Sequence, residues 1–110
     1  MREAKLIVPK KWTDEYGEWE TDLGPILEKL TLAYGGVTVT AGQGIWKAPD
    51  GSIVNEPVHI LTVAIPVRLG RTEALWGAAR YVGEAFKQEE VYLRTPNGEV
   101  HLLKRETDYN

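Results

Sequence analysis

Two strands and the turn between them are expected in residues 37–65, VTVTAGQGIWKAPDGSIVNEPVHILTVAI. Apolar and polar side chains alternate from Val37 to Ala41, which is the period of a strand. Gly42-Gln43-Gly44 interrupts the alternation and predicts a bulge before Ile45-Trp46-Lys47 resumes it. Pro49-Asp50-Gly51 predicts a turn, so the chain is expected to return as an antiparallel partner.

The return strand is expected to run from about Ile53 to Pro66. One of its faces carries His59, Leu61, Val63 and Ile65, and the other carries Glu56, Val58, Ile60, Thr62 and Ala64. Because both faces are largely apolar, this strand is predicted to be central in a sheet and covered on both sides.

Outward from this hairpin, two helices are predicted from apolar side chains that recur at helical spacing. The first set is Leu23, Ile26, Leu27, Leu30 and Tyr34, and the second is Leu75, Ala78, Ala79, Val82 and Phe86. Further strands are expected at 5–8, 91–95 and 99–103, the last two joined by the turn Pro96-Asn97-Gly98. The order predicts an α+β fold, a ferredoxin-like βαββαβ two-layer sandwich with an extra C-terminal hairpin strand.

Composition is consistent with one domain over residues 1–110, with a long aromatic and acidic loop at 9–21 and a polar tail at 104–110. The chain has no cysteine, which excludes disulfides and thiol chemistry, and no His or Asp stands at metal-ligand spacing, so neither metal nor cofactor is expected. A net charge of -3 without a Lys/Arg cluster argues against nucleic acid. No apolar run is long enough for a membrane span or leader, so a soluble, cytoplasmic protein is expected.

The sheet face away from the helices is the expected place for function. An exposed stripe of Val58, Ile60 and Ala64 is unusual for a monomer, so the face is predicted to be buried in a homo-oligomer, a dimer or trimer. Glu56 lies on this face, and Thr38 and Thr40 on the neighbouring strand are expected on the same side. Trp46 joins them there unless the expected bulge at Gly42-Gln43-Gly44 changes the phase of the strand beyond it. A carboxylate, an indole and hydroxyls on an apolar floor can bind a polar, cationic or nucleoside-like ligand.

Two interpretations of Glu56 stay open. Burial can raise the pKa of its carboxyl enough for acid–base work, or the carboxylate can form an ion pair with a Lys or Arg across a subunit boundary. Trp12 and Trp19 likewise have two interpretations, since they can clamp a ligand or pack on a neighbouring subunit.

The motifs resemble a group of small bacterial and phage proteins with this βαββαβ layout. The resemblance rests on Gly35-Gly36-Val37-Thr38, Gly42-x-Gly44-x-Trp46, Asp50-Gly51 with Glu56, and Phe86-x-Gln88-Glu89-x-Val91. It covers roughly residues 22–103 and implies the fold rather than an activity.

A more distant resemblance is to phage S-adenosylmethionine lyases, which also have a helix ending in Tyr-Gly, here Tyr34-Gly35, and a Glu at the start of a following strand. Those enzymes are trimers that bind S-adenosylmethionine between subunits and release methylthioadenosine and homoserine lactone. The resemblance implies that Trp46 takes the aromatic position and Glu56 that of the catalytic carboxylate. The chain departs from the family where an indole replaces a tyrosine and where one Glu stands in place of a pair.

Three functions therefore stay open. The first is a homo-oligomer that binds a small nucleoside-like ligand at subunit interfaces, through Trp46, Thr38, Thr40, Trp12 and Trp19. The second is a lyase of the S-adenosylmethionine type with Glu56 as its catalyst. The third is a noncatalytic structural or protein-interaction module.

Overall fold

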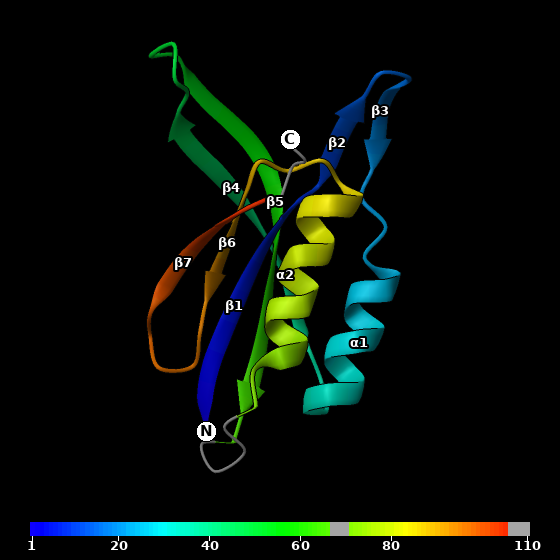
Figure 1. Cartoon of the computed structure of the whole chain (residues 1–110), viewed down its shortest axis with the longest axis vertical. Helices are drawn as coiled ribbons and strands as arrows, with labels where there is room; N and C mark the ends of the chain where they lie inside the picture. The colour runs from blue at the N-terminus through cyan, green and yellow to red at the C-terminus, as the bar shows by residue number, and fades with distance from the viewer. Residues whose placement is uncertain (67–70, 106–110) are drawn as a thin grey trace.

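A computed structural model describes residues 1–66 and 71–105. Its seven strands are β1 (Arg2–Pro9), β2 (Lys11–Asp14), β3 (Gly17–Glu20), β4 (Thr38–Lys47), β5 (Ile53–Ile65), β6 (Glu90–Arg94) and β7 (Val100–Lys104). The two helices are α1 (Gly24–Tyr34) and α2 (Glu73–Ala85). Five strands form an antiparallel sheet in the order β4-β5-β1-β6-β7, and β2 and β3 form a separate pair. Both helices lie on one side of the five-stranded sheet (Figure 1).

The core lies between this sheet and the helices. Leu6 of β1 pairs with Leu61 of β5 on one side and with Leu93 of β6 on the other, and all three are buried. The predicted helix face of β5 is confirmed for Leu61, Val63 and Ile65, which belong to the buried cluster. The helices contribute the buried side chains Ile26, Leu30, Leu75, Ala78, Ala79 and Val82.

The prediction of a loop at 9–21 is wrong, because most of these residues form the β2–β3 hairpin. Trp12 pairs with Trp19 across the hairpin, and Gly17 takes a φ of 136° in the tight reversal. One backbone hydrogen bond, from Lys10 N–H to Pro57 O (3.1 Å), ties the base of the hairpin to the sheet, and a second, from Thr21 N–H to Lys10 O (3.0 Å), closes that base. Strands of four residues are too short to show a period against a background of charged residues, so the pattern predicted no structure there.

The predicted bulge at Gly42-Gln43-Gly44 is also wrong. The pairing of β4 with β5 is uninterrupted, with Gly42 opposite Val58 and Gly44 opposite Glu56. Neighbouring side chains fill the space above both glycines: a Cβ on Gly42 would lie 2.9 Å from Ile60 Cδ1, and one on Gly44 would lie 3.3 Å from Val58 Cγ1. The glycines thus make room for larger neighbours and leave the strand unbroken.

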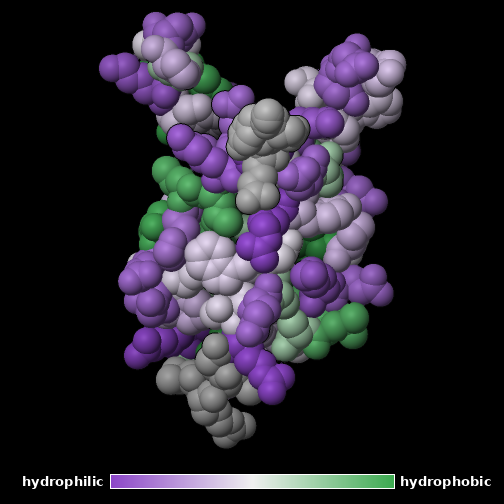
Figure 2. All heavy atoms as spheres, in the orientation of Figure 1, coloured by the Kyte–Doolittle hydropathy of each residue, from purple (hydrophilic) through white to green (hydrophobic). Residues whose placement is uncertain are grey.

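The β2–β3 hairpin and the far half of the β4–β5 hairpin project past the helices as two arms (Figure 1). Both arms end in mostly hydrophilic tips, as the space-filling view shows (Figure 2). Of the predicted polar tail at 104–110, Lys104 is the last residue of β7, and 106–110 lie outside the described residues. Among the described helices none is long and apolar enough to cross a bilayer.

Candidate functional site

The uninterrupted register of β4 and β5 brings Glu56 and Trp46 together. Gly44 is directly opposite Glu56, and Trp46 is opposite Val54. Residues opposite each other in antiparallel strands share a face, as do residues two apart along a strand, so Trp46 is the diagonal neighbour of Glu56. This face is the one away from the helices, because the alternate residues Leu61 and Val63 are those buried in the core.

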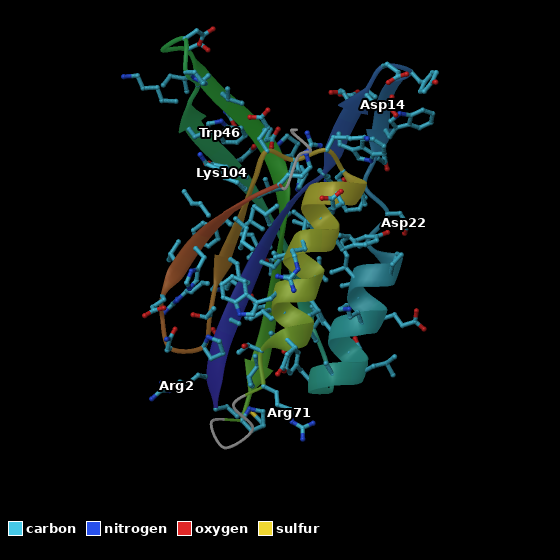
Figure 3. All side chains as sticks on the ribbon, viewed as in Figure 1. Arg2, Asp14, Asp22, Trp46, Arg71 and Lys104 are labelled. Carbon is cyan, nitrogen blue, oxygen red and sulfur yellow. The ribbon has the colours of Figure 1, made fainter. Side chains whose placement is uncertain are left out.

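The indole of Trp46 folds back over Gly44. A Cβ on Gly44 would lie 3.3 Å from Trp46 Cζ3, so the ring occupies the space that a side chain at Gly44 would need. Trp46 remains 45% exposed, which leaves indole surface free for contact beside the carboxylate. Figure 3 places Trp46 on the β4–β5 arm, whereas Asp14 is on the β2–β3 arm.

The Glu56 carboxyl is partly withdrawn from water, and this desolvation raises its pKa above the ordinary value of 4.5. Within residues 1–66 and 71–105, no Lys, Arg or His nitrogen lies within 4.0 Å of the carboxylate, and its side chain makes no hydrogen bond. A partly buried carboxyl without a partner can hold a proton at a higher pH than usual, or it can pair with a cationic ligand.

Glu56 also borders a pocket of about 250 Å³ that three separate parts of the chain enclose. The β2–β3 hairpin, β5 and the connection from α2 to β6 line it with Lys11, Trp12, Thr13, Glu18, Glu56, Pro57, Lys87 and Gln88. Its charges are mixed, and Lys11 Nζ lies 3.8 Å from Glu18 Oε1. The pocket therefore offers groups of both signs beside an indole.

Two of these residues, Lys87 and Gln88, end α2 in a defined geometry. Lys87 has a φ of 55°, a left-handed conformation that usually favours glycine. Gln88 N–H donates to Gly83 O (3.0 Å), and Gln88 Nε2 donates to Phe86 O (2.8 Å). No sequence motif marks Lys87, because its place in the pocket depends on the β2–β3 hairpin, which is distant in sequence.

Trp12 and Trp19 have different surroundings. The Trp12 ring lies 6.1 Å from that of Phe86 and 6.4 Å from that of Trp19, centroid to centroid, and Trp12 packs against the core while lining the pocket. Trp19 is 46% exposed, does not line the pocket, and donates its Nε1–H to Asp14 Oδ1 (3.0 Å). Trp12 is therefore placed near Glu56, and Trp19 supports it from the outer side.

Thr38 and Thr40 lie further along the same sheet face. Thr40 is opposite Ile60 and Thr38 opposite Thr62, four and six residues along β5 from Glu56. At about 3.4 Å per residue these positions are about 14 Å and 20 Å from Glu56. Within one chain, Thr38 is thus too distant to touch a small ligand held by Glu56.

Neither His59 nor His101 lines the pocket that Glu56 borders. His59 is partly buried, and desolvation and then the charge of Lys10 lower its pKa below 6.5. His101 stacks edge-on against Trp76, with ring centroids 4.8 Å apart, and its Nε2 is 3.5 Å from Glu99 Oε1. In the part of the chain that the structure describes, no three His, Asp or Glu side chains gather as a metal site would need.

The chain is similar in fold to two solved structures of phage S-adenosylmethionine lyase. One, in complex with S-methyl-5'-thioadenosine, superposes with a TM-score of 0.68 at 16% identity over 97% of this chain and 92% of that one. The other, in the apo state, superposes with a TM-score of 0.61 at 17% identity over 97% of this chain and 91% of that one. At this identity the likeness shows a shared α+β fold and nothing finer. No family model matches the chain, and no curated protein matches it in sequence.

Proposed function

We propose that this chain is a homo-oligomeric protein that binds a small, polar, nucleoside-like ligand on the sheet face beside Glu56. The observation that carries the proposal is the partly buried Glu56 carboxyl, unpaired among the described residues, next to the Trp46 indole that lies over Gly44. An indole face suits the flat base of a nucleoside, and a carboxylate suits ribose hydroxyls or a positive centre. The neighbour that holds S-methyl-5'-thioadenosine on the same fold supports this ligand class.

The finer description of the fold belongs to the same proposal. Without β7 and the β2–β3 pair, the strand order β4-β5-β1-β6 is the one expected for a ferredoxin-like βαββαβ sheet. We place the complete chain in this class as one domain, and we place the protein in the cytoplasm, where nucleoside ligands are made and used.

The expected exposed stripe is wrong for Val58, which is buried within the chain, and Ile60 is half-buried. Oligomerisation is still part of the proposal because the face away from the helices carries other exposed apolar side chains. Trp46 is 45% exposed, Val100 52% and Leu102 58%, and all three lie on the face away from the helices. Apolar surface of this kind is commonly covered by a partner. In the proposal a second copy covers it and completes the ligand site.

The test is ligand-induced thermal stabilisation of the full chain by S-methyl-5'-thioadenosine, adenosine and S-adenosylmethionine. A ligand at a hundred times its Kd adds about 2.7 kcal/mol to the free energy of unfolding, so binding gives a clear rise in Tm. Trp46→Leu and Gly44→Ala are expected to abolish the rise, the second by displacing the indole. Tyr16→Leu, on the exposed tip of the other arm, is the matched control and keeps the rise. No rise with any of the three ligands contradicts the proposal.

A second candidate function is S-adenosylmethionine lyase activity. It is favoured by the raised pKa of Glu56 together with the fold likeness to enzymes of that name. In this candidate Glu56 lies near the sulfonium, and the methionine carboxylate attacks its own γ-carbon to give homoserine lactone and methylthioadenosine. Chromatography after incubation with S-adenosylmethionine tests it: no product from the wild type excludes the activity, and product that persists in Glu56→Gln removes Glu56 as the catalyst.

A further inference from the structure

Four side chains form a row across the sheet, far from Glu56. Thr38 of β4 is opposite Thr62 of β5, Thr62 is opposite Lys5 of β1, and Lys5 is opposite Arg94 of β6. Opposite residues in antiparallel strands share a face, and the alternate residues Leu6 and Leu93 point into the core. The row, which we call the basic row, therefore lies on the face away from the helices.

Two of the residues in the basic row, Lys5 and Arg94, are cationic and lie directly opposite each other on neighbouring strands. Lys5 is half-buried and its Nζ donates to Thr62 Oγ1 at 3.4 Å, while Arg94 is exposed. Like charges on directly opposite residues destabilise a sheet. An anion that contacts both cations would offset this repulsion.

Carboxylates of the described residues do not neutralise this pair. Over residues 1–66 and 71–105 the salt bridges are Lys11–Glu18 and His101–Glu99, so neither Lys5 nor Arg94 has a carboxylate within 4.0 Å. Glu3 is the nearest acid on the same face of β1, two residues from Lys5 and opposite Ala64. The charge of the basic row is thus left for a ligand.

An apolar row borders the basic row on this face. Ile7 lies two residues beyond Lys5 and opposite Ile60, and Tyr92 lies two residues from Arg94 and opposite Leu102. A ligand whose anionic group sits on Lys5 and Arg94 can place an apolar or aromatic body on these side chains.

We propose that Lys5, Arg94 and Thr62 bind the phosphate group of a phosphate monoester, with its organic body on Ile7, Ile60 and Tyr92. A guanidinium offers a fork of donors, an ammonium offers a point charge, and a hydroxyl adds a neutral donor, a set that matches the several oxygens of phosphate. The site is independent of the nucleoside site, since Thr62 lies about 20 Å along β5 from Glu56. Where a second copy covers this face, as in the proposed function, the phosphate monoester lies between the two copies and offsets the charge of the cations buried there.

The experiment compares the Tm of the full chain in sodium phosphate and in sodium chloride at matched ionic strength and pH, and then with added phenyl phosphate. We expect phosphate to raise the Tm above its value in chloride, and phenyl phosphate to act at a lower concentration because its ring contacts Tyr92. Lys5→Gln and Arg94→Gln are each expected to lose this phosphate-specific rise. Their Tm in chloride is expected to stay at or above the wild-type value, since one of two opposed charges is gone. Arg80→Gln, an exposed cation on α2, is the matched control and keeps the rise.

Three outcomes overturn the proposal. The first is a wild type whose Tm shows no phosphate-specific rise, and the second is a Lys5 or Arg94 variant that keeps this rise in Tm. The third is a variant that lowers the oligomer mass while phosphate has no effect on the Tm, which would assign the two cations to an ion pair between subunits. Amide chemical shifts of Lys5 and Arg94 in the wild type, titrated with phosphate, give a readout that does not depend on any variant folding. The nucleoside site is tested with S-methyl-5'-thioadenosine and this site with phosphate. The two experiments can therefore fail independently, and each failure contradicts only its own proposal.

Discussion

Glu56 shows how a strand position sets the chemistry of a side chain. Its carboxyl is partly desolvated beside Val58 and Trp46, so ionisation is less favourable in the folded protein and its pKa rises above 4.5. An acid with a raised folded-state pKa favours folding below its unfolded pKa and opposes folding as the pH rises through both values. Neutral pH is therefore the condition in which this carboxylate costs stability.

Glu56→Gln is expected to leave the Tm unchanged at pH 4 and to raise it modestly at pH 7, because the neutral amide removes the cost of desolvating a charge. Thermal denaturation of both proteins at the two pH values measures the difference. Glu28→Gln, at an exposed glutamate on α1, is the control for the loss of one negative charge. A Tm lower than that of the wild type at pH 7 would mean that the ionised carboxylate has a stabilising partner.

Lys87 has an unfavourable backbone conformation at the end of α2. Its φ of 55° is disfavoured for a residue with a Cβ, whereas glycine adopts it readily. Lys87→Gly is expected to raise the free energy of unfolding by about 0.5–1 kcal/mol, a rise in Tm of about 2–8 °C for a domain of this size.

Urea denaturation of the Lys87 variants checks this value. Lys87→Ala removes the same charge but keeps the Cβ, so it separates backbone strain from charge and should give no comparable gain. Equal stabilisation by alanine and glycine would place the cost in the charge of Lys87 and not in its backbone.

At the residue scale, alternation placed Glu56 on the face away from the helices, but it left the side of Trp46 open, because the bulge expected at Gly42-Gln43-Gly44 would have changed the phase beyond it. Thr38 and Thr40 were expected on the same face as Glu56, and they do lie there. Thr38 is nevertheless opposite Thr62, six residues along β5 from Glu56, which is too far for both to touch one small ligand. Neither the role of Lys87 nor the pairing of Lys5 with Arg94 could be predicted, because both depend on how distant parts of the chain come together in the fold.

Among the elements, the β2–β3 hairpin contains an aspartate, Asp14, that accepts two hydrogen bonds within it. Asp14 Oδ1 accepts hydrogen bonds from Trp19 Nε1 (3.0 Å) and from the Tyr16 N–H (2.8 Å), and these bonds, the indole's first, lower the pKa of Asp14 below 3.8. An acid with a lowered folded-state pKa stabilises the fold above its unfolded pKa and loses that effect as the pH falls through the folded value.

Asp14→Ala is expected to loosen the hairpin and leave the five-stranded sheet intact. Amide hydrogen exchange should accelerate over residues 11–20 while the amides of β1 and β5 stay protected. In the wild type, acidification below pH 3.8 should begin the same change, because protonation weakens both hydrogen bonds. Glu15→Ala, at the exposed neighbouring position, is the control. Uniform acceleration across the sheet would show that the hairpin supports the whole fold.

The helices and the β4–β5 pair were predictable because their periods extend over ten or more residues. The hairpin at 11–20 was not, because four-residue strands carry too few side chains for a period to emerge. The bulge was predicted from the two glycines, and the structure shows why that signal misled: Val58, Ile60 and Trp46 occupy the room that the glycines leave.

For the whole molecule, the exposed apolar side chains of the face away from the helices bear on oligomerisation, which stays a prediction. Leu102→Glu is expected to lower the oligomer mass measured by light scattering after size exclusion, because it puts a charge on that face. Leu32→Glu, on α1 and 80% exposed, is the matched control and should leave the mass unchanged. A monomeric wild type at micromolar concentration would contradict the prediction.

The central position of β1 also constrains how the chain folds. The first strand lies between β5 and β6, so Leu6 meets Leu61 and Leu93 only after loops of 55 and 87 residues have closed. Closing such loops costs entropy before any contact compensates for it, which slows folding relative to a chain with local contacts. The β4–β5 hairpin needs no such closure and can form within microseconds. During synthesis β1 can therefore pair with β5 once Ile65 has emerged, whereas its other edge stays unpaired until β6 follows.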